Sequence, residues 1–115
     1  DGETSRDFCY IANAVQANIM AAFHGPENKS AEVYNVAAEK QTTLTQLFNI
    51  IRERLLELRP ELKINDPIYK DFRAGDIRHS LASVEKARKQ IGYNPTYSVE
   101  DGLKECTQWY VENLS

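Results

Sequence analysis

Apolar residues recur at the spacing of an α-helix in four stretches of the chain. The first stretch begins at about Asn13 and is followed by Gly25 and Pro26, where Gly25 is expected to adopt the left-handed conformation that caps a helix. The second begins after Thr43, which has capping-box spacing with Gln46. The apolar positions of these two predicted helices are Val15, Ile19, Ala22 and Phe23, and then Leu44, Leu47, Phe48, Ile51, Leu55 and Leu58.

Two further helices are predicted in the last third of the chain. Ser83 is the expected N-cap of the first, and Gly92 closes it. Ser98 and Asp101 have capping-box spacing at the start of the second. Their apolar positions are Val84, Ala87 and Ile91, and then Val99, Leu103, Cys106, Tyr110 and Leu114.

Short strands are predicted at residues 6–11 and 32–37. Residues 61–82 lack a clear period and are expected to form a long ordered loop, with one more short strand near residues 62–64. The predicted fold class is therefore α/β, as a small helix-rich domain with two or three short strands. Because so few strands make a poor sheet alone, the chain either relies on a sheet that it does not contain or dimerises to complete one.

Composition excludes several functional classes. The chain has 115 residues, enough for one domain, and 14 Lys+Arg against 17 Asp+Glu give a formal net charge of −3. This balance argues against a nucleic-acid binder, which needs a concentrated cationic face. No apolar run is long enough to span a membrane, and no signal peptide is evident. Cys9 and Cys106 are far apart and suit no metal site, so reduced thiols in a cytoplasmic protein are expected.

The candidate chemistry lies in Arg6 and in the loop at residues 71–80. Two guanidinium groups from separate segments, Arg6 and Arg73, could bracket a diphosphate, and the Asp76 carboxylate could accept both hydroxyls of a ribose. In the alternative interpretation, Arg6 pairs with a neighbouring carboxylate, Asp7 or Glu3, while Arg73 and Asp76 close the loop and nothing binds. The residues alone favour this second interpretation.

Several segments in sequence order match one family pattern, namely residues 1–11, 15–18, 34–37, 69–80, 86–87, 91–95 and 102–103. Through these segments the sequence resembles the C-terminal part of extended short-chain dehydrogenase/reductases, and among them the bacterial UDP-N-acetylglucosamine 4-epimerases. The resemblance implies a substrate-binding domain without the Rossmann domain, over residues 1–115. It also implies that this domain anchors UDP while a 4-keto sugar rotates.

The resemblance also implies roles for four residues. Arg6 and Arg73 correspond to the two arginines that contact the UDP diphosphate, and Asp76 corresponds to the aspartate that holds the ribose hydroxyls. Ser80 occupies the position where a bulky side chain excludes N-acetylated sugars. A small residue there leaves space for the acetamido group, which a tyrosine would fill, and so favours UDP-GlcNAc or UDP-GalNAc as the bound sugar nucleotide.

The chain lacks the parts of such an enzyme that perform chemistry. No tyrosine is followed four residues later by lysine, and no glycine-rich dinucleotide motif is present. NAD is therefore expected on a missing N-terminal Rossmann half, and this chain is not expected to be catalytic alone. The alternatives are part of a nucleotide-sugar dehydratase or decarboxylase, and a non-catalytic stand-alone module for binding or dimerisation.

Two departures from the family pattern affect local geometry. Ala12 stands where the family usually has a helix-capping aspartate, so Asn13 caps the helix or the cap is lost. Residues 37–41 replace a glycine-containing turn and disfavour the positive φ angles that glycine allows.

Overall fold

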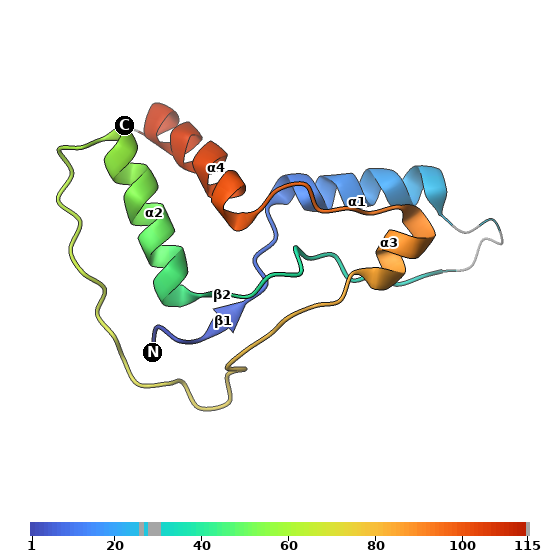
Figure 1. Cartoon of the computed structure of the whole chain (residues 1–115), viewed down its shortest axis with the longest axis horizontal. Helices are drawn as coiled ribbons and strands as arrows, with labels where there is room; N and C mark the ends of the chain where they lie inside the picture. The colour runs from blue at the N-terminus through green and yellow to red at the C-terminus, as the bar shows by residue number, and fades with distance from the viewer. Residues whose placement is uncertain (26, 28–30, 115) are drawn as a thin grey trace.

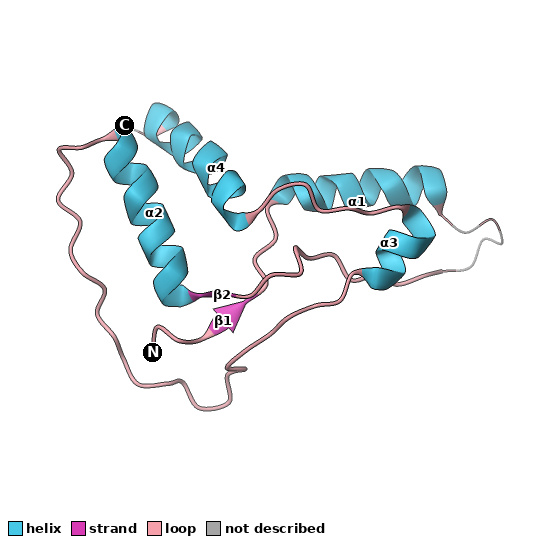
Figure 2. Ribbon diagram, in the orientation of Figure 1, coloured by secondary structure: helices cyan, strands magenta, loops and turns pink. Residues whose placement is uncertain are grey.

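The computed structural model describes residues 1–25, 27 and 31–114. Four helices and one two-stranded antiparallel sheet follow one another along the chain (Figures 1 and 2). The predicted helix-rich class with few, short strands is confirmed. No helix among the described residues is long and apolar enough to cross a membrane. The elements are β1 (Ser5–Arg6), α1 (Ile11–His24), β2 (Thr42–Thr43), α2 (Leu44–Leu58), α3 (Glu85–Ile91) and α4 (Val99–Asn113).

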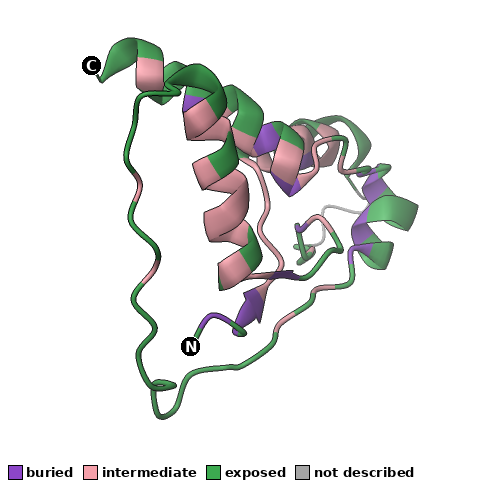
Figure 3. Ribbon diagram, turned by 60° about the vertical axis from the view of Figure 1, so that its left-hand side comes forward, coloured by how far each residue is buried: buried purple, intermediate pink, exposed green. Residues whose placement is uncertain are grey.

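The helices pack in two pairs, α2 against α4 and α1 against α3. β1 and β2 lie between the pairs in the view of Figure 1, with β2 beside the start of α2 and β1 below β2. The cluster of buried apolar residues lies with the second pair and includes residues from both of its helices and from the segments next to them. It consists of Ala17, Ala37, Val84, Ala87, Ile91 and Tyr93. Figure 3 shows this purple cluster near α3, while α2 is mostly half-buried.

Three of the predicted helix ends are confirmed. Thr43 accepts a hydrogen bond from Gln46 N at 3.1 Å, and Thr43 N donates to Gln46 Oε1, which completes the capping box of α2. Ser98 and Asp101 form the equivalent box at α4. Gly92 adopts φ 73°, the left-handed conformation expected at the end of α3.

Two predicted caps are wrong. Gly25 follows α1 in extended backbone, with φ −64°, and so provides no left-handed cap; Pro26 lies outside the described residues. The N-cap of α3 is Val84 rather than Ser83. The Ser83 hydroxyl still accepts a hydrogen bond from Glu85 N, at 3.4 Å, so the residue satisfies a helix donor from one position further out.

The first predicted strand is much shorter than residues 6–11. Only Ser5 and Arg6 pair with β2, Ser5 opposite Thr43 and Arg6 opposite Thr42. The chain then leaves the sheet because the Asp7 carboxylate accepts hydrogen bonds from two backbone N–H groups of other loops, Ala38 N at 2.9 Å and Ala82 N at 3.4 Å. The hydrogen bonds of the Asp7 side chain thus take the place of further backbone pairing between β1 and β2.

The predicted strands at residues 32–37 and 62–64 are absent from the structure. Residues 61–82 form the expected long loop, whose single ladder contact is a parallel bridge between His79 and Ser5. Residues 33–36 make no backbone–backbone hydrogen bond within the described part of the chain. Strand formation there requires a neighbouring strand, and none of the described segments supplies one.

Of the two outcomes predicted at the start of α1, the structure shows the second: Asn13 does not cap the helix, and the side-chain cap is lost. The N-cap is Tyr10, which makes no side-chain capping bond. Asn13 is instead fully buried, where its Oδ1 accepts from Thr96 N and Tyr97 N, both at 3.1 Å, and its Nδ2 donates to Tyr97 O at 2.9 Å. The side chain therefore joins α1 to the segment that leads into α4.

The turn before β2 keeps a positive φ without a glycine. Glu39 adopts φ 57°, although residues 37–41 were expected to avoid this region. Its carboxylate accepts hydrogen bonds from Val84 N at 3.2 Å and from Arg88 Nη2 at 2.8 Å. These bonds hold the backbone in a conformation that costs a non-glycine residue about 1 kcal/mol.

Candidate functional site

The loop at residues 71–80 reaches β1 through backbone hydrogen bonds on both sides of Ser5. Ser5 N donates to Arg78 O at 3.0 Å, and Ser80 N donates to Ser5 O at 3.2 Å. The end of the loop thus runs parallel to β1. This pairing brings together two segments about 70 residues apart in sequence, which can be followed beside β1 in Figure 1.

Arg6 and Asp76 form an ion pair at the centre of this junction. Arg6 Nη2 lies 2.9 Å from Asp76 Oδ1, and both side chains are partly exposed. Arg6 Nη1 also donates to Ser5 O at 2.8 Å and to Arg78 O at 3.4 Å. The expected alternative pairing of Arg6 with Asp7 or Glu3 is therefore not the one observed.

Arg73 and Asp76 belong to one tight turn. Asp76 N donates to Arg73 O at 3.2 Å, and Gly75 between them has φ 81°, in the left-handed region that glycine adopts without strain. Asp76 Oδ1 also accepts from Ile77 N at 2.9 Å, which fixes the carboxylate. No side chain of the described residues pairs with the exposed Arg73 guanidinium, so it is free to bind an anion.

Ser80 lies beside β1 at the end of the loop, four residues after Asp76. Its backbone N–H is fixed on Ser5 O, and the residue is half-buried. Of the four predicted site residues, Arg6 and Asp76 are therefore in contact, and Arg73 lies in the turn that carries Asp76. Ser80 lies in the segment that pairs with β1.

Supporting contacts of two loop residues, Arg78 and His79, were not found by sequence reasoning. Arg78 Nη2 donates to Asp1 Oδ2 at 2.8 Å, and its guanidinium lies 4.9 Å from the centre of the Phe72 ring. The His79 ring forms a hydrogen bond with Ser5 Oγ at 2.8 Å. Successive side chains of a strand point to opposite faces, so the Ser5 side chain points away from the face that carries Arg6. The His79 ring, which bonds Ser5, therefore lies on the opposite face of β1 from Arg6. His79 thus holds the loop in place, away from the ion pair.

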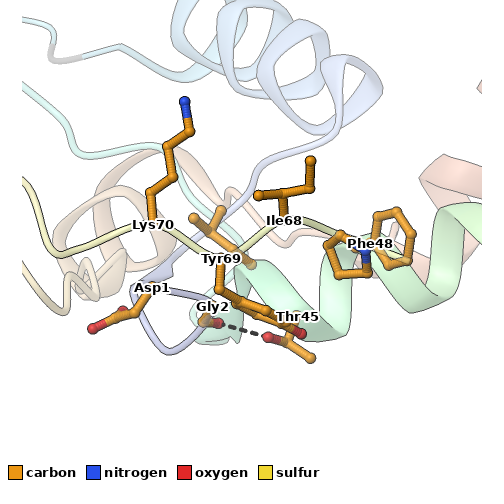
Figure 4. A pocket seen from close by; sticks show the side chains of 9 residues that line it. Asp1, Gly2, Thr45, Phe48, Ile68, Tyr69 and Lys70 are labelled. Carbon is orange, nitrogen blue, oxygen red and sulfur yellow. Dashed lines mark hydrogen bonds between the residues drawn. The ribbon is translucent and has the colours of Figure 1, made fainter. Parts of the chain in front are cut away.

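A cavity of about 290 Å³ lies between the first residues of the chain, the start of α2 and the loop. Figure 4 shows Tyr69 and Ile68 on one side of it and Phe48 on another, with the hydrogen bond from Thr45 Oγ1 to Gly2 O at 3.0 Å. Asp1 connects this cavity with the site because it lines the cavity and also holds Arg78.

Solved structures of sugar-nucleotide enzymes are similar to the whole chain. A UDP-glucose 4-epimerase from Thermotoga maritima, solved with UDP-glucose, is 35% identical with a TM-score of 0.78, over 100% of this chain and 34% of that one. A UDP-N-acetylglucosamine 4-epimerase from Methanobrevibacter ruminantium, in complex with UDP-N-acetylmuramic acid, is 38% identical with a TM-score of 0.76, over 97% and 33%.

Curated relatives include a different reaction class. The dTDP-glucose 4,6-dehydratase of Haemophilus influenzae is 29% identical over 122 residues, which cover 100% of this chain and 35% of the dehydratase. The chain spans about a third of the length of the curated relatives that it matches. No protein-family profile matches it.

Proposed function

The chain matches the C-terminal part of the UDP-sugar 4-epimerases of the extended short-chain dehydrogenase/reductase family, and from this premise we propose that it anchors the UDP portion of a UDP-sugar. Arg6 and Arg73 bind the diphosphate from two sides, since a planar guanidinium offers two parallel N–H donors to phosphate oxygens. Asp76 accepts the ribose hydroxyls. The observation that carries the proposal is the contact of Arg6 with Asp76, with Arg73 unpaired in the same turn.

The hydrogen bonds already present leave capacity for a ligand. A guanidinium has five N–H donors, and Arg6 uses donors on Nη1 and Nη2 for three hydrogen bonds. The remaining donors, on Nε and Nη2, can bind a phosphate. Asp76 uses Oδ1 for Arg6 and Ile77 N, so its Oδ2 can accept a hydroxyl. The ion pair therefore orients the Arg6 guanidinium and the Asp76 carboxylate, and both groups keep hydrogen-bonding atoms that can bind a ligand.

Ser80 supports the narrower proposal that the sugar is N-acetylated, as in UDP-GlcNAc or UDP-GalNAc. The small side chain of Ser80 lies beside β1, the strand that carries Arg6, and leaves space that a tyrosine side chain would fill. A similar structure with UDP-N-acetylmuramic acid bound agrees with this choice.

The chemical step belongs to another part of the enzyme. NAD would oxidise and re-reduce the sugar, and no residue of this chain is assigned to hold it, since the sequence has no dinucleotide motif. The residues of this chain bind and orient the nucleotide. Cys9 and Cys106 are not joined in a disulfide, and we propose a cytoplasmic location for the enzyme.

Calorimetric titration with UDP and UDP-GlcNAc tests the proposal. We expect Arg73→Ala to weaken UDP binding by at least about tenfold, since a hydrogen-bonded charge contributes about 1.5–3 kcal/mol. Arg59→Ala, which removes an exposed arginine at the end of α2, is the matched control and should leave UDP binding unchanged. Equal affinity of the Arg73→Ala and Arg59→Ala chains would refute the role of Arg73.

A second variant addresses the sugar. Ser80→Tyr should weaken binding of UDP-GlcNAc while binding of UDP itself is retained, because the added ring occupies only the space of the acetamido group. If both ligands lose affinity equally, Ser80 does not discriminate between sugars.

A further inference from the structure

Arg78 joins three segments around the candidate site. Its guanidinium donates from Nη2 to Asp1 Oδ2 at 2.8 Å and lies 4.9 Å from the centre of the Phe72 ring. Its carbonyl accepts hydrogen bonds from Ser5 N at 3.0 Å and from Arg6 Nη1 at 3.4 Å. One residue thus contacts the first residue of the chain, strand β1 and the earlier part of its own loop.

The carboxylate that holds Arg78 is itself fixed in place. Asp1 Oδ1 accepts hydrogen bonds from Glu3 N at 3.3 Å and from Thr4 Oγ1 at 3.5 Å, which leaves Asp1 Oδ2 for the arginine. Thr4 is buried, and its carbonyl accepts a hydrogen bond from Leu44 N at 3.0 Å, at the start of α2. The Arg78 guanidinium is therefore tied to a buried part of the fold.

The backbone that leads to Arg73 has few other attachments. No backbone hydrogen bond joins residues 63–72 to another segment of the described structure. The Arg73 carbonyl accepts a hydrogen bond from Asp76 N at 3.2 Å, within the same turn. On the other side of Arg73, its neighbour Phe72 lies against the Arg78 guanidinium. This contact is the attachment that ties the turn to the rest of the fold immediately before Arg73.

We propose that Arg78 is a positioning residue for the diphosphate of the nucleotide: by holding Phe72 against its guanidinium while it is paired with Asp1, it fixes the backbone at Arg73 and so orders the arginine that binds the diphosphate. The proposal rests on the proposed function, which supplies the anion. Arg78 acts through Arg73 and does not bind the anion itself, because the Asp1 carboxylate neutralises its charge.

The chemistry of arginine suits this role. A planar guanidinium can stack on an aromatic ring with its face while N–H groups at its edge donate to a carboxylate, so one side chain holds two partners at once. Lysine carries a compact charge on a flexible stem and cannot fix both partners in this way. A turn that is ordered before the ligand arrives also loses less conformational entropy on binding, which raises the affinity.

A thermodynamic cycle with UDP, measured by calorimetric titration, separates positioning from general damage to the fold. We expect Arg78→Ala to weaken UDP binding about fivefold, since the contacts that it removes are partly exposed. In the Arg73→Ala chain the same change should weaken UDP binding by less than about twofold, because the side chain that is positioned is absent. No loss in the first case, or equal losses in both, would overturn the proposal.

Changes at Phe72 test the stacking contact without removing the arginine. Phe72→Leu keeps an apolar side chain but removes the ring, and it should weaken UDP binding in the same direction as Arg78→Ala. Phe72→Tyr keeps the ring and should bind UDP as the unsubstituted chain does. Equal affinity of the Phe72→Leu and Phe72→Tyr chains would overturn the role of the stack.

Arg52 provides a matched control. Arg52 Nη1 lies 3.0 Å from Asp66 Oδ1, and the guanidinium lies 5.3 Å from the centre of the Phe48 ring. Asp66 belongs to the loop but lies well before the turn that carries Arg73. Arg52→Ala removes the same two kinds of contact and should leave UDP binding unchanged. A loss as large as that of Arg78→Ala would overturn the specific role of Arg78.

A ligand-free measurement tests the positioning role independently of UDP. In ¹⁵N NMR relaxation, we expect the order parameters of the Arg73 and Ala74 amides to fall below about 0.6 in the Arg78→Ala chain and to stay higher in the unsubstituted and Arg52→Ala chains. Unchanged order parameters in the Arg78→Ala chain would overturn the proposal. Order parameters that fall as expected, in a chain that binds no UDP, would refute the proposed function, so the two failures are distinguishable.

Discussion

At the scale of single residues, buried polar side chains fix how the segments meet. Asn13 satisfies three backbone groups of Thr96 and Tyr97 from within the core. Tyr93 is buried with its hydroxyl donating to Ala37 O at 2.7 Å, and burial raises the pKa of this phenol, so it remains a neutral donor. These contacts specify one arrangement because the groups they satisfy would otherwise be buried without partners.

Replacing Asn13 tests this role. Asn13→Ala should lower the free energy of unfolding by about 3 kcal/mol, because it leaves two N–H groups and one carbonyl unpaired. Asn18→Ala on the same helix is the control, since Asn18 is exposed and bonds only to Ala14 O. Urea denaturation monitored by circular dichroism gives both values. A loss no larger than that of the control would contradict the account.

Glu39 links the stability of the chain to pH. The hydrogen bond from Arg88, followed by that from Val84 N, lowers the pKa of this carboxyl below its usual 4.5. A lowered pKa contributes stability that is fully present above pH 4.5 and is lost as the pH falls through the folded-state pKa. Glu39→Gln should therefore flatten the fall in the free energy of unfolding below about pH 4.5, measured by urea denaturation from about pH 3 to 7. An unchanged slope would show that Glu39 is not responsible.

Neither residue could be assigned its role from the sequence. Asn13 and its partners are more than 80 positions apart, and capping rules describe only neighbours within one turn. Glu39 was expected to avoid positive φ because local propensity ignores the two hydrogen bonds that its carboxylate receives.

At the scale of elements, local sequence patterns predicted the helices correctly, whereas the strands that they predicted are shortened or absent. The capping boxes of α2 and α4 formed as expected because each uses residues three apart. Strands need partners from elsewhere in the chain, and β1 finds only two residues of β2. The predicted strand at residues 6–11 therefore ends at Arg6, where Asp7 turns to bind the loops.

The docking of α4 depends on a glycine. A Cβ at Gly102 would lie 2.6 Å from the Tyr10 ring, which also contacts the Tyr97 ring with centroids 5.0 Å apart. Gly102→Ala should lower the free energy of unfolding by about 1–3 kcal/mol through overpacking, although alanine is the better helix former.

A double-mutant cycle separates this contact from helix propensity. Adding Tyr10→Leu to Gly102→Ala should recover part of the loss, because the two residues touch and their effects do not add. Additive effects in urea denaturation would contradict close packing of α4 on Tyr10.

At the scale of the whole molecule, the fold brings the start of the chain and the long loop into one site. The residue types of Arg6, Arg73 and Asp76 suit diphosphate binding but equally suit a loop that binds nothing, and it is the resemblance to a known family that favours diphosphate binding. Their proximity depends on the pairing of β1 with residues 78–80, which no local pattern encodes. The supporting pair Arg78–Asp1 was missed for the same reason.

The central claim is that Arg6, Arg73 and Asp76 hold the UDP part of a sugar nucleotide. Titration of UDP into the isotopically labelled chain, followed by NMR chemical shifts, tests it most directly. The account predicts saturable shifts confined to residues 5–7 and 72–80, which disappear when Arg73 is replaced by alanine. Shifts centred elsewhere, or none from a folded chain at millimolar UDP, would contradict it.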